Sequence, residues 1–207
     1  MVSQPWPPHS ADEYSQEALT RLGPDLAARF ETVRALIFDA DGVLTSGNLV
    51  YGPQGEALKE FDSQDGLGLV MARIVGLKRG VITGRDSEIV ATRARELKFD
   101  TICLGRFDKV AALAEMLSEL GCHEDETLYM GDDLLDLPVL YRVGIPVTVP
   151  AAPRELKEHC CYVTAAEGGH GAVREVVDLV LKCRRLYTVA LESLDQKAWR
   201  PQAGGTS

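Results

Sequence analysis

The sequence of 207 residues lacks any long hydrophobic run, and no stretch approaches the roughly 20 apolar residues of a transmembrane helix. Its first residues, MVSQPWPPHSADEYSQ, have neither the basic start nor the apolar stretch of a signal peptide. These two absences predict a cytoplasmic protein with no membrane partner.

Positive charge is also scarce. Lysine and arginine together number 22 against 31 aspartates and glutamates, which gives a net charge of -9. Because nucleic-acid backbones are held by clustered lysine and arginine, this balance argues against a nucleic-acid partner. An acidic protein can still bind a small phosphate ester where a metal ion and a few cations line one pocket.

Cysteines are few and follow no metal-binding pattern. The five are Cys103, Cys122, Cys160, Cys161 and Cys183, an odd number without CxxC spacing. The adjacent pair would point in different directions on any regular element, so a shared metal site is not expected. We expect reduced thiols that pack as small hydrophobic side chains.

Short apolar runs alternate with helical stretches along most of the chain, whose length suits one domain. The predicted strands are 33–38, 80–82, 100–104, 127–130 and 145–149, and the predicted helices between them are 66–75, 86–97, 108–120 and 134–142. This alternation predicts an α/β fold with a doubly wound, mostly parallel sheet.

Three segments fall outside this alternation. Residues 1–32 are expected to form an N-terminal helical extension that starts at a capping box of Ser10 and Glu13. Residues 47–62 contain Gly-Pro-Gln-Gly between two extended segments, which predicts a β-hairpin flap. The main domain is expected over 33–195, with one last helix from 172 to about 194, and a disordered tail over 196–207.

Polar side chains gather where the predicted strands end. The first strand is followed by Asp39 and Asp41, the second by Thr83, Gly84 and Arg85, and the fourth by Asp132, Asp133 and Asp136, while Lys109 opens the helix after the third. Ligands of doubly wound sheets sit outside the carboxyl ends of the strands, so these groups are expected to converge on one crevice.

Several carboxylates in one small site repel one another unless a cation compensates them. Carboxylate and carbonyl oxygens suit Mg²⁺, which completes its shell with water and substrate phosphate. Thr83 and Lys109 add a hydroxyl donor and a fixed positive charge for phosphate oxygens. A carboxylate can then act as the nucleophile through an aspartyl-phosphate. The pattern predicts a magnesium-dependent phosphatase.

Four motifs resemble those of the haloacid dehalogenase superfamily: FDADGVLT at 38–45, ITGR at 82–85, Lys109, and GDDLLD at 131–136. The segments LVYGPQGEALKEF, DSQDGLG, YMGDDLLDLPVL and GGHGAVREVVDLVL are similar to the 3-deoxy-D-manno-octulosonate 8-phosphate phosphatases within it, over about residues 34–183. The resemblance implies a HAD-like Rossmannoid fold without a large cap domain, an acidic sugar phosphate as substrate, Mg²⁺ as cofactor and a homotetramer.

The resemblance also implies roles for the reacting groups. Asp39 would attack phosphorus and bind Mg²⁺, and Asp132 would be the other metal carboxylate. Asp41 would protonate the leaving alcohol and then activate water, and its backbone carbonyl would bind the metal. Thr83 and Lys109 would hold the phosphoryl group.

For the remaining positions the implied roles concern the substrate and the loops. Gly84 and Arg85 would lie at the mouth, with Arg85 available to a substrate anion, and Gln64 and Asp65 would belong to a substrate loop. Asp133 and Asp136 would orient Lys109 or the loop around it. The positions to which the resemblance gives these substrate and loop roles are Gln64, Asp65, Gly84, Arg85, Asp133 and Asp136.

Alternative interpretations remain at several positions. Asp136 could be only a helix cap, Asp65 only a helix entry, and His170 an exposed loop residue. Gln64 and His170 stand where the family usually has arginine, which leaves a nonulosonate 9-phosphate or another small ester as an alternative substrate. A catalytically inactive oligomerisation module is a further alternative, although the intact set of catalytic residues argues against it.

Overall fold

A computed structural model describes residues 6–198, and side chains for residues up to 194. Its main sheet has six parallel strands in the order β5-β4-β1-β6-β7-β8. They are β1 (Ala35–Phe38), β4 (Lys78–Ile82), β5 (Thr101–Cys103), β6 (Thr127–Gly131), β7 (Ile145–Thr148) and β8 (Tyr162–Val163). All four residues of β1 are buried, as expected for a strand covered on both faces. The predicted doubly wound α/β fold is confirmed.

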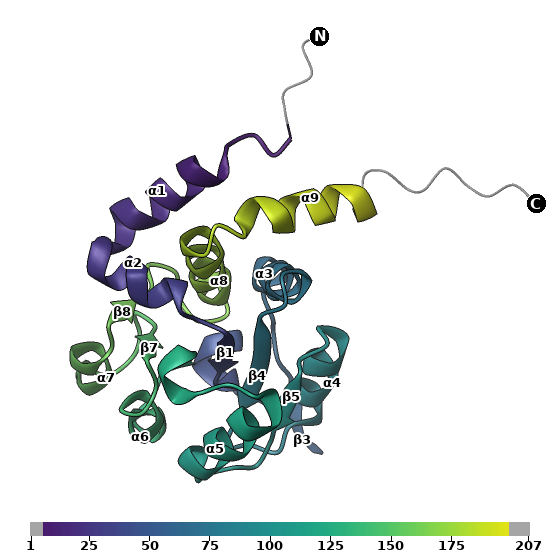
Figure 1. The fold of residues 1–207 in the computed structure, drawn as a ribbon. Helices are drawn as coiled ribbons and strands as arrows, with labels where there is room; N and C mark the ends of the chain where they lie inside the picture. Colours follow the sequence, from purple (N-terminus) through teal and green to yellow (C-terminus); the bar gives the residue numbers. More distant parts are fainter. Residues whose placement is uncertain (1–5, 199–207) are drawn as a thin grey trace, which may run out of the picture.

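Helices cover both faces of the sheet, with α3 and α8 on one side and α5 and α6 on the other (Figure 1). The helices that follow the sheet strands are α3 (Ser63–Ile74), α4 (Glu88–Glu96), α5 (Lys109–Leu120), α6 (Leu137–Leu140), α7 (Arg154–His159), α8 (Ala172–Cys183) and α9 (Tyr187–Ala198). The predicted helix over 134–142 is a short 3₁₀ turn, Leu134–Asp136, followed by α6. Strand β8 and helix α7 were not predicted.

The expected single last helix is two helices, because the chain turns between α8 and α9, where Arg185 adopts a φ of 58°. Helix α9 runs to Ala198, so the first residues of the predicted tail are helical. The rest of that tail, residues 199–207, lies outside the described residues.

The N-terminal residues form α1 (Ala11–Leu22) and α2 (Pro24–Glu31), and α1 starts at the predicted capping box of Ser10 and Glu13. Both helices lie beside α8, on the same side of the molecule as α9 (Figure 1). The rings of Tyr14 and Tyr187 pack 4.7 Å apart, which joins α1 to the start of α9. Within residues 6–198, no helix is both long and apolar enough to cross a membrane.

The predicted flap is a two-stranded antiparallel hairpin, β2 (Val50–Gly52) and β3 (Gly55–Leu58). It lies between β1 and α3 in the chain and is separate from the main sheet. Strand β1 has β4 on one side and β6 on the other, so the chain reverses its direction of winding between β1 and β6. A crevice for ligands is expected at the carboxyl ends of these two strands.

Candidate active site

One pocket opens at the carboxyl ends of β1, β4 and β6. Nine predicted site residues line it, together with Gly47, Leu49, Phe107 and Leu135: Asp39, Asp41, Thr83, Gly84, Arg85, Lys109, Asp132, Asp133 and Asp136. The residues that follow the strands therefore lie together in one pocket, as predicted. They do so because the carboxyl ends of parallel strands lie at one edge of the sheet.

Lys109 lies between two carboxylates of this pocket. It is the first residue of α5, and its Nζ lies 3.0 Å from Oδ2 of Asp39 and 2.6 Å from Oδ1 of Asp136. Burial lowers the pKa of Lys109, but Asp39 and Asp136 outweigh that effect and raise the pKa overall. The ammonium group therefore stays charged and fixes the side chain of Asp39 at the end of β1.

Asp136 is fully buried and accepts four hydrogen bonds. Its Oδ1 accepts from Nζ of Lys109 (2.6 Å) and from the hydroxyl of Tyr129 (2.7 Å). Its Oδ2 accepts from the backbone N–H groups of Asp132 (3.0 Å) and Asp133 (3.2 Å). Asp136 thus contacts both Lys109 and the loop after β6, the two features that it was predicted to orient. The exposed Asp133 caps the turn by accepting from the N–H of Leu134.

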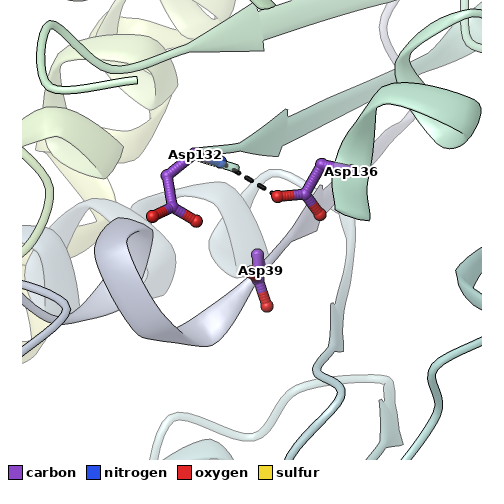
Figure 2. Close-up of side chains that lie close together, drawn as sticks. All are labelled: Asp39, Asp132 and Asp136. Carbon is purple, nitrogen blue, oxygen red and sulfur yellow. Dashed lines mark hydrogen bonds between the residues drawn. The ribbon is translucent and has the colours of Figure 1, made fainter. Parts of the chain in front are cut away.

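Three carboxylates lie close enough to surround one ion (Figure 2). Oxygens of Asp39, Asp132 and Asp136 all lie within 4.8 Å of one another. The hydrogen bonds to Asp136 already occupy both of its oxygens, which leaves Asp39 and Asp132 as the carboxylates that can bind a metal. The predicted pair of metal carboxylates is compatible with this geometry.

The electrostatics of the pocket fit a divalent cation. Burial, followed by the charges of Asp39 and Asp136, raises the pKa of Asp132 to about 8. Burial and Asp136 also raise the pKa of Asp39, against the opposing effect of Lys109. One ammonium group is not enough to compensate these acids, and oxygen ligands with excess negative charge suit Mg²⁺.

The loop after β1 passes directly against Asp132. Gly42 adopts a φ of 81°, and a Cβ atom there would lie 1.9 Å from Oδ2 of Asp132. Only glycine fits this conformation and this approach. The backbone next to Asp41, the residue whose carbonyl was predicted to bind the metal, therefore adjoins the Asp132 carboxylate.

Thr83 and Arg85 follow β4 on the opposite side of the pocket from β6. Thr83 is buried, and its N–H donates to the carbonyl oxygen of Cys103 at 3.0 Å. Its Oγ1 accepts from the N–H of Arg85 at 3.3 Å. The guanidinium group of Arg85 lies 5.8 Å from the ring centre of Tyr51 in the hairpin, so the mouth of the pocket is bordered by the flap.

Sequence reasoning missed two residues of the hairpin segment that reach this site. Nζ of Lys59 contacts Oδ1 of Asp41 and lies 2.9 Å from Oε1 of Glu56. Both residues lie in the segment LVYGPQGEALKEF, which carried the family resemblance, but no local pattern marks Lys59 as a contact of Asp41 or Glu56 as a partner of Lys59. Their position depends on how the hairpin folds back.

The two residues of the predicted substrate loop, Gln64 and Asp65, do not line this pocket. Asp65 is 3% exposed, and its carboxylate accepts from the N–H groups of Gly171 (3.3 Å) and Arg174 (2.7 Å) at the start of α8. The side chain of Asp65 thus serves as a cap for α8 and does not line the pocket. Gln64 is exposed on α3 and does not line the pocket, and His170 is exposed in the loop before α8.

Comparison with known proteins agrees with this geometry. The sequence profile of the haloacid dehalogenase-like hydrolases matches residues 83–176. The 3-deoxy-D-manno-octulosonate 8-phosphate phosphatase of Yersinia pestis is 40% identical over 165 residues, which are 78% of this chain and 88% of that protein. The chain belongs to this family of phosphatases. A relative from Haemophilus influenzae is 36% identical over 75% of this chain and 87% of its own length.

Solved structures of the family extend the match to three dimensions. The phosphatase of Moraxella catarrhalis, solved with a magnesium ion, a phosphate ion and a KDO molecule, has a TM-score of 0.79 at 34% identity, over 82% of this chain and 98% of that one. The cobalt-bound form of the Haemophilus influenzae enzyme has a TM-score of 0.76 at 35% identity, over 78% of this chain and 94% of that one. The HAD-like fold and the family resemblance are confirmed.

Proposed function

We propose that the protein is a magnesium-dependent phosphatase that hydrolyses 3-deoxy-D-manno-octulosonate 8-phosphate to the free sugar and phosphate. The observation that carries this proposal is the position of Asp39, fixed by Lys109 in the same pocket as Asp41, Thr83 and Asp132. The names of the relatives and the ligands of the Moraxella structure support the choice of substrate.

In the first step a carboxylate oxygen of Asp39 bonds to phosphorus while the bond from phosphorus to the sugar oxygen breaks. Asp41 gives its proton to that leaving oxygen. In the second step water attacks phosphorus, Asp41 takes the proton of the water, and the bond to Asp39 breaks, which releases phosphate. Each half-reaction thus returns Asp41 to the state that the other needs.

Other residues of the pocket hold the phosphoryl group during both steps. Lys109 and Thr83 line the pocket, and we expect the ammonium and the hydroxyl to stabilise the phosphoryl oxygens, with Arg85 available to a substrate anion at the mouth. Magnesium, when held by Asp39, Asp132 and the carbonyl of Asp41, supplies positive charge that offsets the negative charge of the phosphoryl oxygens and of the carboxylates.

The assembly and the compartment complete the proposal. We propose a homotetramer in which the hairpin contributes to subunit contacts, supported by the exposed apolar side chains of Leu49, Val50, Tyr51 and Leu58 on it. We propose a cytoplasmic enzyme of cell-envelope carbohydrate synthesis. Sedimentation of the purified protein tests the tetramer, and a monomer at micromolar concentration would contradict it.

A panel of phosphate esters tests the substrate. We expect kcat/KM for 3-deoxy-D-manno-octulosonate 8-phosphate to exceed that for a nonulosonate 9-phosphate by about tenfold, because a change of one carbon in a sugar changes its contacts by about 1–3 kcal/mol. Gln64 and His170, which replace the usual arginines, favour the nonulosonate as the second candidate. A higher kcat/KM for that ester, or for an unrelated one, would overturn the choice of sugar.

Magnesium is expected to stabilise the fold, and more so at high pH. The pKa of Asp132 and the pKa of Asp39 are raised above the roughly 3.9 of an unfolded aspartate, so the metal-free fold binds extra protons. The stability that these bound protons contribute to the fold is fully present below a pH of about 3.9, and it is lost as the pH rises through about 8. Mg²⁺ replaces the protons. At a concentration 100-fold above its Kd it is expected to raise Tm by about 5–10 °C near pH 8.5.

The measurement is thermal unfolding with and without Mg²⁺ from pH 6 to pH 8.5. The gain in Tm should shrink toward pH 6, where protons compete with the metal, and should disappear in Asp132→Asn. A gain that does not depend on pH, or that persists in Asp132→Asn, would contradict this metal site.

A further inference from the structure

Within one subunit, few apolar contacts hold the hairpin in its position beside the pocket. Within the described chain, no apolar side chain of residues 46–60 is buried, and those of Tyr51 and Leu58 are 60% and 47% exposed. An isolated two-stranded hairpin is marginally stable in water, so its position depends on specific contacts with the rest of the protein.

In contrast to the exposed apolar side chains of the hairpin, the side chain of Lys59 is 0% exposed. Its ammonium group contacts Oδ1 of Asp41 and lies 2.9 Å from Oε1 of Glu56. A buried lysine is stable only when its charge is paired. Lys59 therefore joins the hairpin segment to the loop that carries Asp41.

Glu56 is itself held in place. Its Oε2 accepts a hydrogen bond from the hydroxyl of Ser87, at the start of α4. Burial raises the pKa of Glu56, but the hydrogen bonds from Ser87 and Lys59 outweigh that effect and lower the pKa overall. Glu56 is therefore a second charged partner that anchors Lys59, in addition to Asp41.

The two oxygens of Asp41 differ. Oδ1 is held by Lys59, whereas the buried Oδ2 has no hydrogen-bond partner among the described residues. Nε of Arg85 lies 3.7 Å from Oδ2, which is too long for a hydrogen bond. An unpaired buried oxygen costs free energy and is expected where a reacting group takes the missing place.

We propose that Lys59 is a positioning residue for the acid/base Asp41. Its ammonium group fixes Oδ1 and so presents Oδ2 to the oxygen of the leaving group and then to the attacking water. This inference rests on the proposed function, and it adds that the hairpin completes the active site of its own chain. When the hairpin is in place, Asp41 is therefore also positioned for proton transfer.

The dependence on leaving group separates positioning from folding. The sugar alcohol is a poor leaving group that needs the proton of Asp41, whereas p-nitrophenolate leaves without one. Lys59→Met is expected to lower kcat/KM, which reports the step that expels the leaving group, by about 10²-fold for the sugar 8-phosphate and by less than about fivefold for p-nitrophenyl phosphate, because misplacement of a catalytic group by about 1 Å has this cost. Glu60→Gln, at the exposed neighbouring position, should leave both reactions unchanged.

Two further variants keep the test decisive. Glu56→Gln leaves the ammonium in place but weakens its anchor, so it should give the same selectivity with a smaller loss, even if Lys59→Met folds poorly. Equal losses on both esters in these variants, or no loss on either, would overturn the positioning role. Asp41→Asn tests the proposed function separately from the role of Lys59: if its loss in kcat/KM is the same for both esters, the acid/base role of Asp41 fails instead.

Discussion

Replacement of Asp39 with asparagine is expected to abolish magnesium-dependent phosphate release, with a loss of about 10⁴-fold or more in kcat. The amide cannot form the bond to phosphorus, and no other carboxylate can take its place. Asp132 faces the loop at Gly42, and both oxygens of Asp136 are occupied by donors. A colorimetric phosphate assay with saturating Mg²⁺ and sugar phosphate measures the loss.

The variant should fold, because it removes one negative charge from a crowded acidic cluster. We expect the metal-free Tm of Asp39→Asn to be no lower than that of the parent protein. Acid quenching with labelled substrate should trap a phosphorylated protein for the parent and none for the variant. Asp25→Asn, at an exposed position on α2 outside the pocket, is the matched control and should retain activity. Full activity in Asp39→Asn would exclude the covalent mechanism.

The sequence was sufficient to predict the sheet and the groups at its strand ends. Strand and helix alternate at regular intervals, and parallel strands bring residues such as Asp39, Thr83 and Asp132 to one edge whatever their separation in the chain. The weaker predictions concerned short elements. Strand β8 has two residues and α7 has six, which is too little for a periodic pattern to be visible.

Side-chain partners that come from remote segments could not be predicted. Asp65 accepts a hydrogen bond from Gly171, 106 residues later at the N-cap of α8, and no local pattern distinguishes such a cap from a substrate ligand. Lys59 contacts Asp41 only because the hairpin returns to the loop after β1. The roles of both residues depend on elements that pack against them in space, which their neighbours in the sequence do not reveal.

Asp136→Asn is the substitution for which we expect the largest loss of stability, about 3–5 kcal/mol, since it breaks a buried ion pair. The two oxygens of the carboxylate face donors on both sides, Lys109 and Tyr129 at one and two backbone N–H groups at the other. An amide has only one oxygen, so either orientation places its NH₂ against a pair of donors. For a chain of this size the loss corresponds to a fall in Tm of about 10 °C.

The same substitution decides whether Asp136 acts on the metal or on the lysine. Its carboxylate belongs to the acidic cluster, yet its hydrogen bonds assign it to Lys109 and the loop after β6. We expect kcat/KM to fall by about 10²-fold or more, because Lys109 loses one of the two carboxylates that fix it. The Mg²⁺-induced gain in Tm should persist in Asp136→Asn and vanish in Asp132→Asn. Loss of that gain in Asp136→Asn would instead make Asp136 a metal ligand, with Lys109 positioned by Asp39 alone.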